Sequence, residues 1–251
     1  MSMTVNADDL GLDESTSRAI LEAFKKNYIS SSTLMVNMPY AEAAADLVRT
    51  EGLADRIGLH LNITAGEPLS EGIRNNPLIC GNDGVFNAAF YHTTKYRLYM
   101  DDLTIRQIKD EFRAQIERFL SFGFKELHID SHHHVHTNYP VYRALKQLSA
   151  EYDLKYVRLS RNMYHGGSIP NRVYKFFYNK GIEKLSEEHT DLFGSFTDLF
   201  AYINGDENAL RALIDKKNIE VMVHPMYKDG ILYDTDTKME DEWRLLCHAQ
   251  G

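Results

Sequence analysis

The sequence predicts one α/β domain over residues 1–251, folded as a distorted (β/α) TIM-like barrel. Short apolar runs alternate with amphipathic segments, which favours parallel strands joined by helical crossovers. A chain of 251 residues with 43% hydrophobic content has the usual size of one such barrel. Histidine and aspartate recur where the predicted strands end. In barrel proteins, residues at those ends gather at one rim.

The first sixty residues show the alternation well. Aspartate favours helix N-termini, so the first helix is expected to begin near Asp13. The expected order is a strand over 4–7, this helix, a strand over 32–37, a helix over 41–49 and a strand ending at His60.

A long segment over about 64–102 interrupts the rhythm. Glycine and proline recur along it and mark turns. Loops of this length inside a compact domain are usually functional or act as lids. We therefore expect an insertion here that lies over the barrel.

The second half resumes the alternation. Thr104 is the expected N-cap of the clearest helix, and Gly123 is expected to end it. Its apolar face is predicted to consist of Ile105, Ile108, Phe112, Ile116 and Phe119. The remaining elements expected are a strand ending at Asp130, a helix over 141–150, a strand over 155–159, a helix over 207–216 and a strand over 219–223.

Residues 127–136 contain five of the eleven histidines and Asp130. Neutral imidazole is the commonest side-chain ligand of divalent ions, so this cluster predicts a metal site. A solvated histidine-rich loop is the alternative. On a continuing strand, His132, His134 and His136 would share one side, whereas a turn after Asp130 would break that alternation. The spacing by itself does not select the ligand.

Three further strand ends carry candidate residues. Asp8 and Asp9 are adjacent carboxylates, which repel each other unless a cation lies nearby. Ordinary helix-start aspartates are the alternative, although this explains Asp13 better. His60 and His224 also end apolar runs, and each alone would be an ordinary core or surface histidine. Their shared position at strand ends favours a common site.

The strings Asn6–Gly11, Gly58–Asn62, Asp130–His136 and His224-Pro225 together resemble those of the YdjC-like carbohydrate deacetylase family, which includes chitooligosaccharide deacetylases of the ChbG type. The match extends from residue 4 to about residue 230. Leu10 and Met226 depart from the family pattern, where phenylalanine and glycine are usual. The resemblance implies a distorted barrel that removes acetyl groups from N-acetylated sugars with a divalent metal.

Carried over position by position, the resemblance makes Asp9, His60 and His132 the metal ligands. It makes Asp8 the catalytic base and His224 the acid. Such chemistry suits amide hydrolysis, which needs an activated water, a polarised carbonyl and a proton for the leaving amine. One carboxylate and two imidazoles suit Zn, Co or Ni by softness, and Mg and Mn are also candidates. For the single divalent ion we expect Mg or Zn first, with Mn or Co as alternatives.

Other polar and aromatic residues each have two alternative roles. Asp130 either orients His132 or His224, or is structural. His134 and His136 either line the sugar site or orient ligands. Arg158 and Arg161 either reach substrate oxygens or form solvent-facing ion pairs. The loop aromatics could stack on sugars or pack the loop onto the barrel: Phe86, Phe90, Tyr91 and Tyr96.

The amino-acid composition excludes some classes of binding partner. A net charge of −8 argues against nucleic acid or an anionic membrane surface, and a small N-acetylated sugar fits better. Cys80 and Cys247 form no metal or disulfide motif, and neither a signal segment nor a membrane span is expected, so we predict a soluble cytoplasmic protein. A homo-oligomer is a general expectation for such enzymes. A metal-dependent phosphoesterase and a catalytically silent metal- or sugar-binding protein are the alternative functions.

Overall fold

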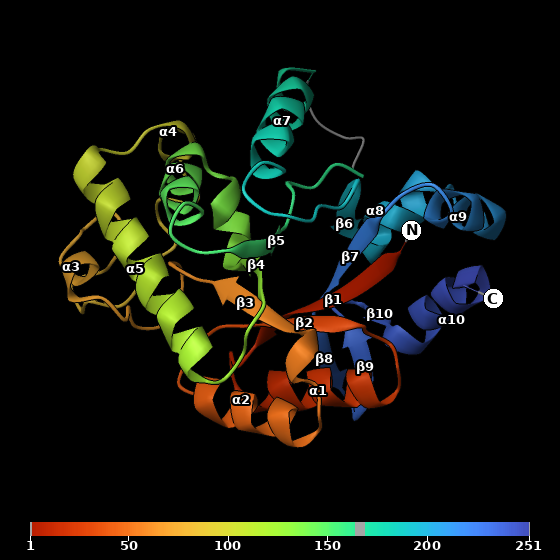
Figure 1. Cartoon of the computed structure of the whole chain (residues 1–251). Coiled ribbons are helices and arrows are strands. Elements are labelled where there is room, and N and C mark those ends of the chain that lie inside the picture. Colours follow the sequence, from red (N-terminus) through yellow and green to blue (C-terminus); the bar gives the residue numbers. More distant parts are fainter. Residues whose placement is uncertain (1, 164–168, 251) are drawn as a thin grey trace.

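A seven-stranded parallel sheet forms the centre of the computed structural model, which describes residues 2–163 and 169–250. Its strands follow the order β5-β4-β3-β2-β1-β7-β6. The sheet curls, and helices surround its outer side (Figure 1). This arrangement confirms the predicted distorted barrel. The strands are β1 (Met3–Leu10), β2 (Ser31–Leu34), β3 (Ile57–Leu61), β4 (Leu127–Ser131), β5 (Leu154–Val157), β6 (Leu192–Ser195) and β7 (Ile219–Val223).

The barrel is closed by irregular chain instead of an eighth strand in this sheet. The edge strands β5 and β6 are not hydrogen-bonded to each other. Instead, the Glu187 and Glu188 amides donate to the Leu154 and Lys155 carbonyls, at 3.1 and 2.9 Å. This segment leads directly into β6, so it bridges the gap between the two edges.

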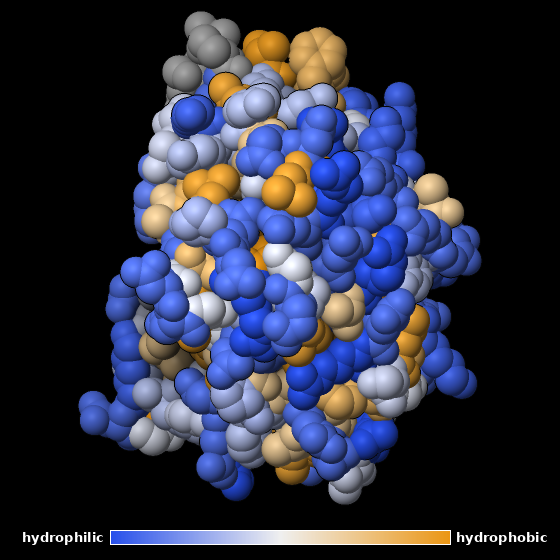
Figure 2. Space-filling view, turned by 90° about the vertical axis from the view of Figure 1, so that its left-hand side faces the viewer, coloured by the Kyte–Doolittle hydropathy of each residue, from blue (hydrophilic) through white to orange (hydrophobic). Residues whose placement is uncertain are grey.

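The outer helices bury one apolar face each, and the face of the molecule in Figure 2 is mostly hydrophilic, with scattered hydrophobic residues. On α5, the five predicted residues from Ile105 to Phe119 are at most 2% exposed. Asp101, and not Thr104, caps this helix, because its carboxylate accepts the Thr104 amide at 2.9 Å. The helices are α1 (Glu14–Lys25), α2 (Ala41–Thr50), α5 (Asp102–Ser121), α6 (Tyr139–Leu148), α7 (Ile169–Ile182), α8 (Phe196–Tyr202), α9 (Glu207–Ile214) and α10 (Met239–Gln250).

Two sequence-based boundaries are confirmed and one is wrong. Asp13 caps α1 by accepting the Thr16 amide at 2.8 Å. Gly123 follows the end of α5 with φ of +90°, a conformation that glycine adopts at no steric cost. The strand expected over 32–37 ends at Leu34, because residues 36–40 form turns that lead into α2.

Residues 64–102 carry short elements of their own. Two helices lie in this segment, α3 (Glu71–Arg74) and α4 (Thr94–Leu98). Phe86 and Phe90 are buried and pack in the core, so the packing alternative holds for these two aromatics. The segment is anchored to α5, since the buried Glu111 carboxylate accepts the Leu69 and Ser70 amides.

The C-terminal part adds a small antiparallel sheet below the parallel one. Its strands are β8 (Pro225–Lys228), β9 (Ile231–Asp234) and β10 (Thr237–Lys238). Strand β8 starts one residue after His224, so this sheet follows directly from the end of β7 and packs on α1 (Figure 1). No helix of the described residues is long and apolar enough to cross a membrane.

Candidate metal centre

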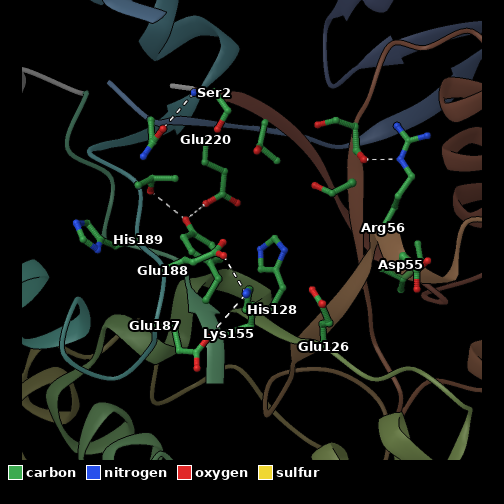
Figure 3. Close-up of a pocket in the computed structure, with 17 residues that line it drawn as sticks. Ser2, Asp55, Arg56, Glu126, His128, Lys155, Glu187, Glu188, His189 and Glu220 are labelled. Atoms are coloured by element: carbon green, nitrogen blue, oxygen red, sulfur yellow. Dashed lines mark hydrogen bonds and ion pairs between the residues drawn. The ribbon is translucent and has the colours of Figure 1, made fainter. Parts of the chain in front are cut away.

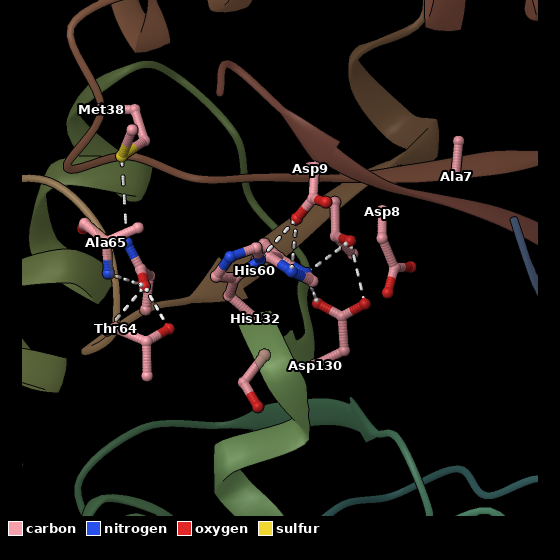
Figure 4. A network of polar contacts seen from close by, with 12 residues as sticks. Ala7, Asp8, Asp9, Met38, His60, Thr64, Ala65, Asp130 and His132 are labelled. Carbon is pink, nitrogen blue, oxygen red and sulfur yellow. Dashed lines mark hydrogen bonds and ion pairs between the residues drawn. The ribbon is translucent and has the colours of Figure 1, made fainter. Parts of the chain in front are cut away.

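Three predicted ligand side chains meet at the carboxyl ends of the central strands. Asp9 belongs to β1, His60 to β3, and His132 follows β4 directly. Asp9 Oδ1 lies 3.1 Å from His60 Nε2 and 2.8 Å from His132 Nδ1. The three ligand atoms all lie within 4.8 Å of one another, and Figure 4 shows the side chains converging.

A local backbone irregularity turns the side chains of Asp8 and Asp9 in different directions. The pairing of β1 with β2 shifts between Ala7 and Leu10, and Asp9 has φ of +70°. A bulge re-aims side chains that would otherwise alternate across the sheet. Asp8 is therefore buried inside the barrel at 2% exposure, while Asp9 faces the two histidines at the rim.

Asp130 orients His60, which differs from both expected partners, His132 and His224. The two residues face each other in the β3–β4 register, and His60 Nδ1 lies 2.7 Å from Asp130 Oδ1. The Thr33 hydroxyl donates to Asp130 Oδ2 at 2.9 Å. A proton held on Nδ1 by Asp130 leaves Nε2 as the metal-facing nitrogen.

Arg158 supplies the cation that the adjacent carboxylates require. Its guanidinium is fully buried and donates two hydrogen bonds to the Asp8 carboxylate, at 2.6 and 2.7 Å. It also lies 2.8 Å from Asp130 and 2.7 Å from Glu220. The ion-pair expectation for Arg158 is therefore right, but its solvent-facing position is wrong. Arg161, by contrast, is partly exposed and pairs with Asp198.

Neighbouring charged groups shift the pKa of Asp8 downward and the pKa of His60 upward. Burial raises the pKa of the Asp8 carboxyl, but Arg158 outweighs burial and holds that pKa well below its usual value. Burial alone would lower the pKa of His60, yet the Asp130 carboxylate raises it to about 10. Asp8 is thus ionised at neutral pH, and a metal ion must displace a proton from His60.

His224 lies on the same rim, after β7. Its backbone amide donates to Asp234 Oδ1 at 2.8 Å, which ties this position to β9. The ring is half-buried and close enough to Asp8 to lower the pKa of that carboxyl. The structure therefore brings all five predicted site residues to one end of the barrel: Asp8, Asp9, His60, His132 and His224.

The neighbouring histidines point in separate directions. His133 is exposed and stacks on Tyr91, with ring centroids 5.4 Å apart. His136 is fully buried and bonds the Ser131 hydroxyl and the Arg158 carbonyl. Burial lowers its pKa to about 4, so it is a neutral structural residue.

Sequence reasoning missed several residues beneath the site. Thr33 links His60 to Asp130, and Glu220 joins Arg158 to the Tyr156 hydroxyl. A signal was present for Glu220, because a lone carboxylate in the apolar run Ile219–Val223 needs a buried partner. Nothing in the local sequence identifies that partner as Arg158.

A cavity of about 540 Å³ opens at the opposite end of the barrel (Figure 3). It is lined by residues near the starts of the strands, including Thr4, Ser31, His128 and Tyr156. None of the five predicted site residues lines it. The metal centre and this cavity are therefore separate features, and Glu220, which lines the cavity, also pairs with Arg158 of the buried network.

Comparisons with known proteins identify relatives of this chain. The profile of the YdjC-like protein family matches residues 2–250. A carbohydrate deacetylase from Clostridium beijerinckii is 32% identical over 233 residues, 92% of this chain and 83% of its own. One from Geobacillus stearothermophilus is 34% identical over 227 residues, 90% of this chain and 79% of its own.

A solved structure shows the same fold. The crystal structure of an Enterococcus faecalis protein, named for cellobiose-phosphate cleavage, has a TM-score of 0.66 at 22% identity. The match covers 98% of this chain and 90% of that one. With the family profile spanning nearly every residue, the resemblance seen in the four sequence strings is confirmed: the chain belongs to the YdjC-like protein family.

Proposed function

We propose that this protein is a carbohydrate deacetylase that uses one divalent metal ion to remove acetyl groups from N-acetylated sugars such as diacetylchitobiose and longer chitooligosaccharides. The convergence of Asp9, His60 and His132 is the observation that carries the proposal. The names of its relatives support the reaction class. The proposal treats residues 1–251 as one catalytic domain acting in the cytoplasm.

The three side chains fit a metal ion. Two ligands bound to one ion at about 2.0–2.2 Å are themselves separated by roughly 3 Å, close to the 2.8 and 3.1 Å measured around Asp9 Oδ1. Histidine hydrogen bonds to Asp9 hold the pKa of its carboxyl well below the usual value, despite burial, so it is a charged donor. Zn or Mg is the favoured ion, with Mn or Co as alternatives. When bound, the ion would activate water and polarise the acetyl carbonyl.

Asp8 is the proposed base. The Arg158 guanidinium donates a hydrogen bond to each of its two oxygens, and Asn6 Nδ2 donates to Oδ1 at 2.9 Å. These bonds hold the carboxylate in one orientation. A carboxylate of low pKa is ionised at neutral pH but is a weak base, so its effect on the attacking water depends on its orientation. Positioning, rather than high basicity, is what the surrounding residues provide.

His224 is the proposed acid. It follows β7, which pairs with the strand that carries Asp8 and Asp9, and its backbone amide donates to Asp234. A protonated imidazole there would donate its proton to the departing sugar amine. The reaction thus uses separate groups for the water and for the leaving amine.

A phosphoesterase would need a cation that is free to bind phosphate. The buried cation of the site, Arg158, is already engaged by Asp8, Asp130 and Glu220. A phosphate would need basic side chains with unused donors. The observed ion pairs therefore favour an uncharged amide substrate.

The direct test is acetate release from diacetylchitobiose and other N-acetylated sugars by metal-stripped protein resupplied with Mg, Mn, Co or Zn. Asp8→Asn should keep metal binding and lose about 10²–10⁴-fold in turnover. Asp13→Asn, a matched change at an exposed helix cap that Asn also fills, should leave turnover unchanged. Full activity in Asp8→Asn would refute the base assignment.

Metal binding is tested independently by thermal unfolding. A ligand at about 100 times its Kd stabilises the folded state by roughly 2.7 kcal/mol. The wild type should show this gain and Asp9→Asn should not. Metal-dependent stabilisation without acetate release from any sugar would favour the silent binding protein instead.

A further inference from the structure

Two consecutive histidines after His132 have an uncommon backbone. His133 and His134 have φ of +53° and +54°, the left-handed region that non-glycine residues seldom adopt. Such conformations persist where the surrounding structure enforces them, often at functional sites. The turn sends His132 to Asp9 and His133 outward to Tyr91. The His134 side chain takes a third direction, toward Phe193.

His134 packs beside the same aromatic ring as Arg158, the cation that holds the proposed base Asp8. Its ring meets the Phe193 ring edge to face, with centroids 5.7 Å apart. The Arg158 guanidinium packs over the same Phe193 ring at 4.8 Å. Asp8, Arg158 and His224 all act electrostatically on the His134 ring. The imidazole is therefore close to both groups that would handle protons.

The hydrogen bonds of His134 are incomplete. Nδ1 is fully buried and has no partner, and no hydrogen bond joins Nε2 to a described residue. A neutral imidazole carries one N–H and one lone pair. Burying a bare lone pair is more readily tolerated than burying an unpaired N–H. We assign the proton to Nε2, which makes the accessible edge of this half-buried ring a donor.

We propose that His134 is a substrate-binding residue whose Nε2–H donates a hydrogen bond to the acetyl oxygen of the sugar. This inference rests on the proposed function and deepens it. The acetyl carbon must lie where Asp8 can take a proton from the water and His224 can give one to the amine. His134 shares the Phe193 ring with Arg158, which holds Asp8, and its own ring forms no hydrogen bond with a described residue. The acetyl oxygen gains negative charge as water adds, so the bond strengthens in the transition state.

The test compares two substitutions at His134. Glutamine can place an amide N–H near the position of Nε2, whereas asparagine is too short but is well tolerated at positive φ. His134→Asn should lower kcat by about 10²–10³-fold with little change in KM. His134→Gln should recover most of the loss. His133→Asn, at the neighbouring exposed residue of like backbone, should stay within about threefold of wild type.

Two further readouts separate binding from structure. Zinc affinity by calorimetry and unfolding in urea should be alike for His134→Asn and His134→Gln, since neither variant removes a ligand. Equal kcat in His134→Asn and wild type would overturn the inference, as would a loss that glutamine does not recover. Wild-type protein that releases no acetate would instead defeat the proposed function itself.

Discussion

At the residue level, Arg158 provides the positive charge that compensates the buried carboxylates of the barrel. Three carboxylates, on Asp8, Asp130 and Glu220, share its single charge, and none of these side chains is more than 2% exposed. Ions buried this deeply are costly unless paired and fully hydrogen-bonded. The site therefore depends on one buried residue, which holds both the proposed base Asp8 and Asp130, the carboxylate that orients His60.

Replacing Arg158 tests this dependence. Arg158→Gln should lower the free energy of unfolding by about 3–5 kcal/mol, because it leaves buried carboxylates without a counter-charge. Urea unfolding is the measurement. The control Arg18→Gln breaks an exposed pair with Glu14 and should cost at most about 1 kcal/mol. Equal losses in both variants would show that the buried network contributes no special stability.

Sequence reasoning succeeded for residues that end strands and was less successful for their partners. Asp9, His60 and His132 could be placed together because parallel strands end on one side of a barrel. The partner of Asp130 was predicted wrongly, since the β3–β4 register that sets it opposite His60 is a pairing between distant segments. Periodicity along one strand carries no information about that register.

At the scale of elements, close approach of β3 and β4 requires a glycine. A Cβ on Gly58 would lie 2.6 Å from the His128 carbonyl oxygen and 3.0 Å from its Cβ. Backbone atoms paired in a parallel ladder cannot shift without disturbing their neighbours. His60, two residues later on the same strand, depends on this ladder for its place beside Asp130.

Gly58→Ala should therefore destabilise the protein by about 1–3 kcal/mol through overpacking. Metal affinity should fall with it as His60 moves. Gly72→Ala is the matched control, because open space surrounds Gly72 and its substitution should be neutral or slightly stabilising. Unfolding in urea and zinc calorimetry measure both effects. An unperturbed Gly58→Ala variant would contradict the close packing of the two strands.

On the scale of the whole molecule, the C-terminal sheet and α10 bring two acids together behind His224. Asp234 bonds the His224 amide, and Glu242 on α10 is 4% exposed. Burial and the neighbouring Asp234 raise the pKa of Glu242 to about 9. An acid with a higher pKa in the folded chain holds its proton better when folded. Stability therefore falls as pH rises from the unfolded value near 4.5 toward 9.

Glu242→Gln should remove this pH dependence. The variant should be more stable than wild type at pH 9 by at least about 1 kcal/mol, since a tenfold difference in acidity corresponds to about 1.4 kcal/mol. Near the unfolded pKa of 4.5 the two should be similar. Urea unfolding across this range is the measurement, with the exposed Glu240→Gln as control. Parallel curves for wild type and Glu242→Gln would disprove the buried protonated carboxyl.

The alternating elements, the parallel barrel and the set of strand-end residues could all be predicted from the amino-acid sequence. These follow from local periodicity and from the rule that parallel strands end on one side. Three features became known from the three-dimensional fold: Asp130 bonds His60, Arg158 pairs with Asp8, and irregular chain bridges the two edge strands of the sheet. Such pairings join residues far apart in sequence, and they depend on strand register, bulges and burial, which no local pattern specifies.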